Sequence, residues 1–350
     1  MTGPTEEAPR AQEAARDAEE AARQTRVARA RWLDPAWRAT ALAWVEEQLA
    51  RLGLAITGAI EQPHLRPWST ALSVPTNKGR VWFKAGGPGN RYEAALLEAL
   101  ARWGTKGILA PLAVDTDRGW LLLPDGGTRL RETLDGGPGL EPWERVLAGW
   151  ANVQRELSPR ALELVAAGVP DRRPSALAES LPRLIDDPDV DLEDPDRVRL
   201  RDLLPAYERW CSELEAFGVP ASLQHDDLHD GNVFVGPDGD RIFDWGDASV
   251  SHPFGTLLVT FRSIAAHGLG GGSEERRALT RLRDAYLEPW TDVHARASLT
   301  AAVPMAMRVA IVGRALSWKG ALSGIPVRDH GQWSGNVGGW LMELFEPTPL

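Results

Sequence analysis

The chain has 350 residues, 43% of them hydrophobic and 25% charged, which is typical of a globular protein with one large domain or two lobes. Its formal net charge of −10 disfavours a nucleic-acid partner held by phosphate contacts and is compatible with a cationic ligand. The single cysteine, Cys211, excludes an internal disulfide framework. No signal-peptide pattern is visible and no apolar run approaches a membrane span, so we expect a cytoplasmic protein without a membrane partner.

The first part of the sequence predicts a charged segment followed by a small β-rich lobe. Residues 1–33 are rich in Ala, Glu and Arg, a composition of either a marginal helix or a disordered tail. A firmer helix is expected after Asp34, an N-cap residue followed by Pro35. Strand-like patterns follow, with one helix over 92–103, so residues 34–125 predict a mainly antiparallel sheet with an inserted helix. The predicted strands cover residues 56–61, 68–74, 81–84, 108–114 and 120–123.

The rest of the chain, residues 126–350, predicts a larger and mainly helical lobe after a Pro/Gly-rich break. Apolar residues recur at helical spacing in seven segments, which is the pattern of helices packed on a common core. These segments are 142–157, 175–185, 194–217, 256–266, 274–290, 301–322 and part of 331–345. The fold class predicted from this order is α+β with two lobes.

The most informative stretch has the form H-x-D-x-x-x-x-N, from His225 to Asn232, followed by D-W-G at Asp244. The turn composition of residues 236–240 predicts a hairpin between them. With Val235 opposite Arg241, Asn232 would lie opposite Asp244, with Cβ atoms about 5 Å apart. An amide oxygen and a carboxylate at that separation can share one Mg²⁺ ion. The alternative is a polar pair that closes a surface hairpin.

The five-residue spacing to Asn232 favours Asp227 over Asp226 as the carboxylate that accepts a proton from a substrate hydroxyl. We expect His225 to be a structural residue that holds the loop through its ring nitrogens. A different interpretation takes the His and Asp residues of this loop as ligands of a catalytic transition metal, since two His stand four positions apart as on a helix. The Gly and Pro residues around the loop disfavour that helix.

In the first lobe, Lys84 ends an apolar strand and Glu93 lies on the buried stripe of the following helix. Because a lone buried carboxylate is costly, we expect an ion pair between them that holds Lys84 for the phosphates of a nucleotide. A purely structural salt bridge is the alternative. No Gly-rich loop lies between the first two predicted strands. Leu123 and Asp125 are expected to contact the adenine ring of the nucleotide through backbone groups at the lobe junction.

The combined motif, His225-x-Asp227-Leu-His-x-Gly-Asn232 with Ile-Phe-Asp244-Trp-Gly, resembles the aminoglycoside phosphotransferase and choline kinase-like family. The resemblance implies a protein-kinase-like fold and phosphorylation of a small-molecule hydroxyl with ATP or GTP and Mg²⁺. It also implies that Asp227 is the catalytic base, that Asn232 and Asp244 bind the metal, and that Lys84 binds phosphates. Asp226 departs from the family pattern, where a small residue is usual.

The acceptor site is expected to be built from the C-terminal helices. Asp230 and Asp247 could hold a cationic group and Trp333 could stack on a sugar, although each could also be an ordinary surface carboxylate or core aromatic residue. The candidate acceptors are aminoglycosides, amino-sugars, sugars and amino alcohols. Besides the kinase, two hypotheses stay open: a catalytically silent nucleotide-binding relative and a His/Asp metal-dependent hydrolase. The oligomeric state is not indicated.

Overall fold

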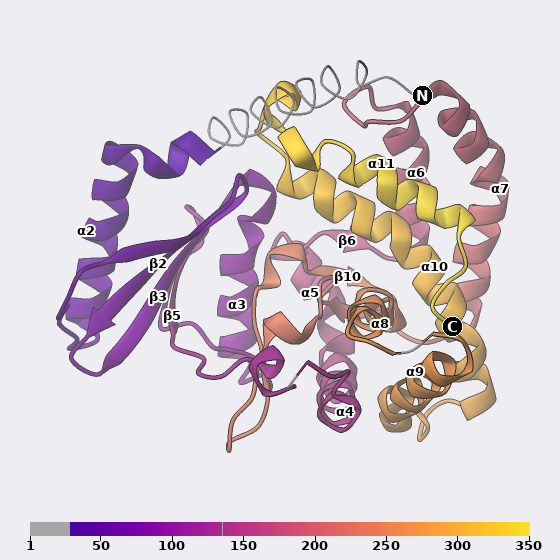
Figure 1. The fold of residues 1–350 in the computed structure, drawn as a ribbon, viewed down its shortest axis with the longest axis horizontal. Coiled ribbons are helices and arrows are strands. Elements are labelled where there is room, and N and C mark those ends of the chain that lie inside the picture. The colour runs from indigo at the N-terminus through magenta and orange to yellow at the C-terminus, as the bar shows by residue number, and fades with distance from the viewer. Residues whose placement is uncertain (1–28, 135, 270) are drawn as a thin grey trace, which may run out of the picture.

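The computed structural model describes residues 29–134, 136–269 and 271–350. It has a small lobe built around one sheet and a larger helical lobe, placed side by side as in Figure 1. Most of the charged segment predicted over 1–33 lies outside the described residues; residues 29–33 of it are helical. The α+β, two-lobed class predicted from the sequence is therefore confirmed.

The small lobe is a five-stranded antiparallel sheet in the order β1-β2-β3-β5-β4. Helix α2 (Pro35–Arg51) covers one face and begins where predicted, because the Asp34 side chain accepts hydrogen bonds from the backbone N–H groups of Ala36 and Trp37. Helix α3 (Tyr92–Arg102) is inserted after the third strand. The strands are β1 (Glu61–Leu65), β2 (Ser69–Thr76), β3 (Gly79–Gly86), β4 (Ala113–Asp115) and β5 (Trp120–Pro124).

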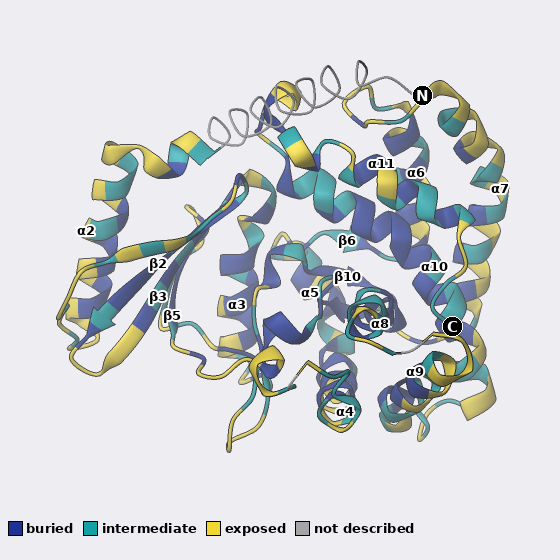
Figure 2. Ribbon diagram, viewed as in Figure 1, coloured by how far each residue is buried: buried dark blue, intermediate teal, exposed yellow. Residues whose placement is uncertain are grey.

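Side chains along β3 point alternately into the buried core of this lobe and to the opposite face of the sheet. Val81, Phe83 and Ala85 point to the face covered by α2, where Phe83 packs with Trp44 and Trp120. Since successive side chains of a strand point to opposite faces, Lys84 faces away from that core. Figure 2 shows buried residues along the strands of the sheet and along α2, which covers it.

Two predicted strands are shifted. The strand expected over 56–61 is β1, which starts only at Glu61; Ile56 forms an isolated bridge to Thr76 instead. The run 108–114 splits, because Ile108 pairs with Ile242 of the large lobe and only its end joins the sheet as β4. The first half of the run therefore links the lobes.

The large lobe consists of eight α-helices among the described residues, and α10 lies at its centre, mostly buried. The seven helical segments predicted from the sequence are present, with ends displaced by a few residues. The helices are α4 (Leu140–Leu157), α5 (Ala161–Ala166), α6 (Pro174–Asp186), α7 (Asp194–Ala216), α8 (Leu257–Ala266), α9 (Gly272–Leu287), α10 (Arg296–Ala321) and α11 (Asn336–Met342).

Helix α10 corrects the expectation that no apolar run approaches the length of a membrane span. By length and composition it is apolar enough to cross a membrane, and it is the one such helix in the described part of the chain. However, 67% of its apolar window is buried inside the fold. That burial is what a core helix of a large lobe requires.

Two small β-elements carry the central motif. Strands β6 (Asp171–Arg172), β7 (Ser222–Gln224) and β10 (Ser249–Ser251) form a sheet in the order β6-β10-β7. Strands β8 (Val233–Phe234) and β9 (Arg241–Ile242) form the hairpin. The motif loop therefore runs from the end of β7 to the start of β8, and Asp244 follows β9.

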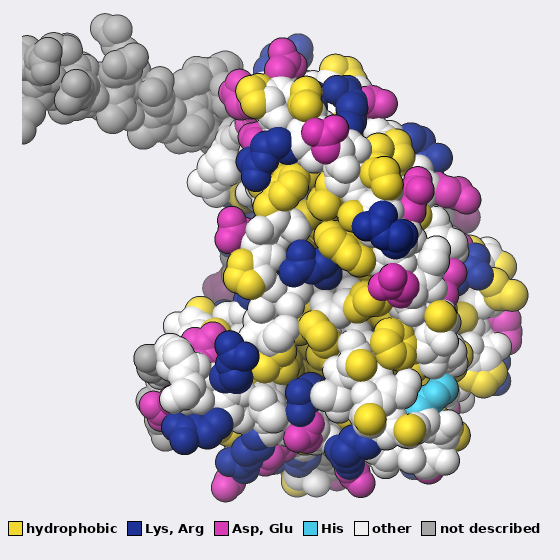
Figure 3. Space-filling view, turned by 90° about the vertical axis from the view of Figure 1, so that its right-hand side faces the viewer, with side chains coloured by type: hydrophobic (Ala, Val, Ile, Leu, Met, Phe, Trp, Pro, Cys, Tyr) yellow, Lys and Arg dark blue, Asp and Glu magenta, His cyan; other side chains and the backbone are white. Residues whose placement is uncertain are grey.

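The outer surface of the large lobe shows mixed charge. On the face turned toward the reader in Figure 3, acidic and basic side chains are interspersed with apolar ones. The net charge of −10 is thus not gathered into a single patch on that face.

Candidate functional site

A cleft of about 480 Å³ separates the lobes. Lys84, Glu93, Asp227, Asn232 and Asp244 all line it. Four elements far apart in the sequence therefore bring the five residues singled out by the motifs to one place: β3, α3, the loop after β7 and the segment after β9.

The loop after β7 is held by His225, as the sequence predicts. The ring is fully buried; its Nε2 lies 2.9 Å from the carbonyl oxygen of Phe243, and its Nδ1 accepts a 3.3 Å hydrogen bond from the Asp227 N–H. Burial lowers the pKa of His225 to about 4, so the ring is neutral near pH 7. This neutral ring ties the loop to the end of the hairpin.

Asn232 is oriented by the same loop. Its Nδ2 donates to the carbonyl oxygen of Asp227 at 3.0 Å. Because the amide nitrogen is engaged, the side-chain oxygen is left for another partner, and the residue lines the cleft. That orientation suits a cation ligand.

The predicted ion pair between Lys84 and Glu93 is present, and Asp244 joins it. Lys84 Nζ lies 2.6 Å from Glu93 Oε1 and 2.6 Å from Asp244 Oδ1, while the N–H of Trp245 donates to the same Glu93 oxygen at 2.9 Å. Desolvation opposes the ionisation of Asp244, but Lys84 outweighs it and lowers the pKa of Asp244 to about 2. Asp244 is therefore a carboxylate that already attracts positive charge.

The hairpin register predicted from the sequence is wrong by one residue. Val233 pairs with Ile242 and Phe234 with Arg241, so Asn232 lies opposite Phe243 rather than Asp244. Asp244 instead adopts a left-handed backbone conformation (φ 66°), and its side chain enters the same cleft as that of Asn232. The pair is thus assembled by a backbone turn and not by direct cross-strand opposition.

Asp227 is partly exposed and shares a guanidinium with Asp247. Arg314, on α10, places Nη2 2.9 Å from Asp227 Oδ1 and Nη1 3.0 Å from Asp247 Oδ1. Desolvation raises the pKa of Asp247 to about 6, against the opposing effect of Arg314. The predicted candidate Asp247 therefore lines the cleft, but it already has a cationic partner.

Asp226, the extra acid of the motif, points away from the cleft. Its carboxylate is buried with Arg172 at 3.1 Å and accepts a hydrogen bond from the Ser249 hydroxyl. Arg172 also donates to the Ser317 hydroxyl of α10. Asp226 has φ 61°, a conformation in which Asp is tolerated better than most residues with a side chain. Its charge is therefore compensated inside the large lobe.

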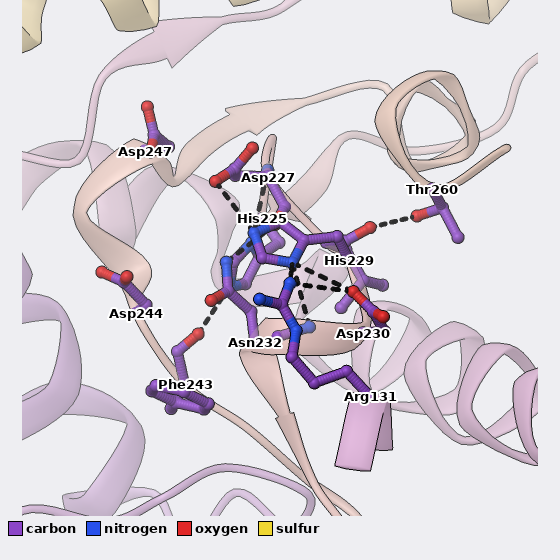
Figure 4. Close-up of polar contacts among 12 residues, drawn as sticks. Arg131, His225, Asp227, His229, Asp230, Asn232, Phe243, Asp244, Asp247 and Thr260 are labelled. Atoms are coloured by element: carbon purple, nitrogen blue, oxygen red, sulfur yellow. Dashed lines mark hydrogen bonds and ion pairs between the residues drawn. The ribbon is translucent and has the colours of Figure 1, made fainter. Parts of the chain in front are cut away.

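Asp230 and Trp333 do not take the places expected for acceptor-binding residues. Asp230 is 2% exposed and contacts Arg131 at 3.0 Å and His267 at 3.3 Å, on the side of the loop away from Asp244 (Figure 4). Trp333 packs edge-on against Trp68 outside the cleft lining. Asp230 is thus paired with Arg131 and Trp333 is engaged in aromatic packing, and their expected role in acceptor binding stays a prediction.

The two residues expected to contact the adenine of the nucleotide, Leu123 and Asp125, also lie outside the cleft lining. Leu123 is buried in β5 opposite Trp82, and Asp125 is exposed, with Oδ1 accepting from the Gly127 N–H. Their expected role through backbone groups stays a prediction.

The His/Asp metal cluster is not assembled. Both ring nitrogens of His225 are engaged, Asp226 faces Arg172, and the segment from His225 to His229 is not helical. Within the described residues, no group of three His, Cys, Asp or Glu side chains is arranged to hold a metal ion. The geometry gives no support to the hydrolase hypothesis.

Sequence reasoning missed Arg314 and Arg172. Arg314 is 8% exposed and interrupts the apolar run 309–316 of helix α10. Because a buried cation is costly without a partner, an Arg in such a run is a signal that a carboxylate lies opposite it. That signal was available in the sequence, whereas the identity of the carboxylates was not.

The model of the phosphotransferase enzyme family (APH) matches residues 90–296. A comparison with curated protein sequences gives no match. A choline kinase from Streptococcus pneumoniae is 16% identical, with 86% of this chain and 98% of that chain covered and a TM-score of 0.54. An ethanolamine kinase from Plasmodium vivax is 14% identical, with 81% and 80% covered and a TM-score of 0.52.

A choline/ethanolamine kinase family protein from Mesorhizobium loti gives 16% identity, coverage of 83% and 90%, and a TM-score of 0.53. At these identities the solved structures establish the shared protein-kinase-like fold. The family match spans 207 of 350 residues and includes Glu93, Asp227, Asn232 and Asp244. The chain therefore belongs to the phosphotransferase enzyme family and transfers phosphoryl groups to small molecules that carry a hydroxyl.

Proposed function

We propose that this phosphotransferase uses ATP or GTP with Mg²⁺ and transfers the γ-phosphoryl group to a hydroxyl of a sugar, amino-sugar, aminoglycoside or amino alcohol. The observation that carries the proposal is the convergence of Lys84, Asp227, Asn232 and Asp244 on one cleft. A general base, two oxygen ligands and a phosphate-binding cation are what hydroxyl phosphorylation requires.

The donor set fits Mg²⁺. Asp244 is ionised and Asn232 keeps its amide oxygen for a partner, and hard oxygen ligands of this kind are those that Mg²⁺ prefers. The Lys84 ammonium group at 2.6 Å from Asp244 supports a preference for positive charge at this position. When bound, the metal would neutralise phosphate charge; Asn232 and Asp244 would hold it.

Asp227 is proposed as the general base. In the transfer, the acceptor hydroxyl gives its proton to the Asp227 carboxylate, and its oxygen forms a bond to the γ-phosphorus. The bond between that phosphorus and the β–γ bridging oxygen breaks, so that the electron pair leaves with the nucleoside diphosphate. Lys84, held by Glu93, would bind the phosphates, and His225 would keep Asp227 in place.

The test compares Asp227→Asn with Asp238→Asn, an exposed hairpin carboxylate that serves as the matched control. Mg²⁺-dependent ATP consumption is followed with a panel of hydroxyl compounds, and nucleotide binding is measured separately. We expect Asp227→Asn to lower transfer by about a hundredfold or more while nucleotide binding is kept. Unchanged turnover would remove Asp227 as the base, and binding without transfer by the wild type would favour the silent relative.

A further inference from the structure

The carboxylates of the cleft already hold cations. Among the described lining residues the acids are Glu93, Asp227, Asp244 and Asp247. Lys84 contacts the first and third of these, and Arg314 contacts the other two. None of them is a bare acidic site for an amine.

Arg314 is fixed in this position. It projects from the buried helix α10, its side chain is 9% exposed, and its guanidinium lies 5.8 Å from the ring of Trp318 and 6.0 Å from that of Trp340. Contacts to two carboxylates use the planar fork of a guanidinium, which a flexible ammonium group cannot reproduce. A cationic acceptor that approaches Asp227 would therefore meet a positive charge that cannot easily move away.

The other residues that line the cleft also disfavour a cationic acceptor. Arg66, Arg129 and Arg131 also line the cleft, and the aromatic side chains of Trp68 and Trp318 lie on it. Guanidinium groups donate hydrogen bonds to hydroxyl oxygens, and indole faces pack against the C–H face of a sugar ring. This lining suits a polyhydroxyl compound better than a polyamine.

Resting on the phosphotransfer function proposed above, we infer that the acceptor is an uncharged sugar or polyol and that Arg314 selects against amines. This differs from the cationic acceptor that the net charge of the chain suggested. The total charge of −10 describes the whole surface, whereas the acceptor meets the paired charges of the cleft.

The test uses the full chain and acceptor pairs that differ by one amine: glucose with glucosamine, and glycerol with 2-amino-1,3-propanediol. Kanamycin and choline are added as cations. ADP release is measured with Mg·ATP, and each product is identified by mass spectrometry. A metabolite extract is incubated in the same way, so that the result does not depend on the chosen panel.

We expect the neutral member of each pair to have a kcat/KM at least about tenfold higher than its amine, and the phosphorylated product from the extract to lack an amine. Arg314→Gln should shrink that ratio by about tenfold, with the KM for ATP changed by less than about twofold. Arg314→Lys, which keeps the positive charge but not the planar fork, should retain part of the preference. Arg308→Gln is the matched control, because Arg308 lies on the same helix but contacts Leu344 and Trp210.

Wild-type preference for the amines, or an unchanged ratio in a folded Arg314→Gln variant, would overturn the inference while leaving phosphotransfer intact. If the Arg314→Gln variant does not fold, the inference is decided by the preference of the wild-type enzyme within each acceptor pair and by the product formed from the extract. Failure of the proposed function gives a different result: no ATP-dependent product from any source, which removes the inference as well.

Discussion

Replacing Asp226 by Ala tests whether the extra acid of the motif is a structural residue. The Asp226 and Arg172 side chains are each 7% exposed and lie 3.1 Å apart, so the substitution leaves a buried guanidinium without its carboxylate. Breaking a buried pair costs roughly 3–5 kcal/mol. Arg172 keeps its contact with Ser317, which favours the lower end. Ala at φ 61° adds about 1 kcal/mol of backbone strain, for a total near 4 kcal/mol.

Urea unfolding followed by the fluorescence of the 15 tryptophans measures this loss. Asp226→Gly should lose about 1 kcal/mol less than Asp226→Ala, since Gly adopts positive φ without strain. The control is Asp186→Ala, which removes a surface pair with Arg201 (side chains 63% and 51% exposed) and should cost below about 1 kcal/mol. A loss for Asp226→Ala no larger than that of the control would refute the structural role.

Two further predictions concern Lys84 and His252. Lys84→Met should lower phosphotransfer by about 10²–10³-fold and destabilise the fold by a few kcal/mol, because Glu93 is left buried without a cation; adding Glu93→Gln should restore stability but not activity. Burial lowers the pKa of His252 from 6.5 to about 3, so below pH 6.5 the unfolded chain binds a proton that the folded chain does not, and stability falls with pH down to about 3. Between pH 7.5 and 5 the loss of stability from this group is about 2 kcal/mol, so the difference in urea midpoint between wild type and His252→Gln should change by a corresponding amount over that range. Parallel pH profiles of the two proteins would contradict this assignment.

Local pattern was enough to predict much of the fold and part of the site. The Lys84–Glu93 pair followed from strand alternation and a helical stripe, since burial forces the two charges to meet. The structural role of His225 followed from its place in a turn-rich loop. These two predictions rested on the burial of side chains that are near one another in sequence, and both agree with the structure.

The predictions that differ from the structure involve contacts between segments that are far apart in the sequence. The observed hairpin register differs from the predicted one because the Val235 N–H donates to the carbonyl oxygen of Thr128, in the segment that follows the sheet, and not across the hairpin to Arg241. Asp230 was a candidate to hold a cationic group of the acceptor, but its carboxylate contacts Arg131, 99 residues earlier in the chain. Neither partner can be identified from spacing, because only the tertiary fold brings it into contact.

Helix α10 fixes the catalytic loop at two adjacent points. Residues three apart on a helix share a face, and here Arg314 contacts Asp227 while Ser317 contacts Arg172, the partner of Asp226. One turn of a buried helix therefore contacts two consecutive loop residues, Asp227 directly and Asp226 through Arg172. The family match ends at residue 296, before this turn. Arg314, which contacts the proposed base and which we propose selects the acceptor, therefore lies outside the part of the chain that the family match covers, whereas Arg172 and His225 lie inside it.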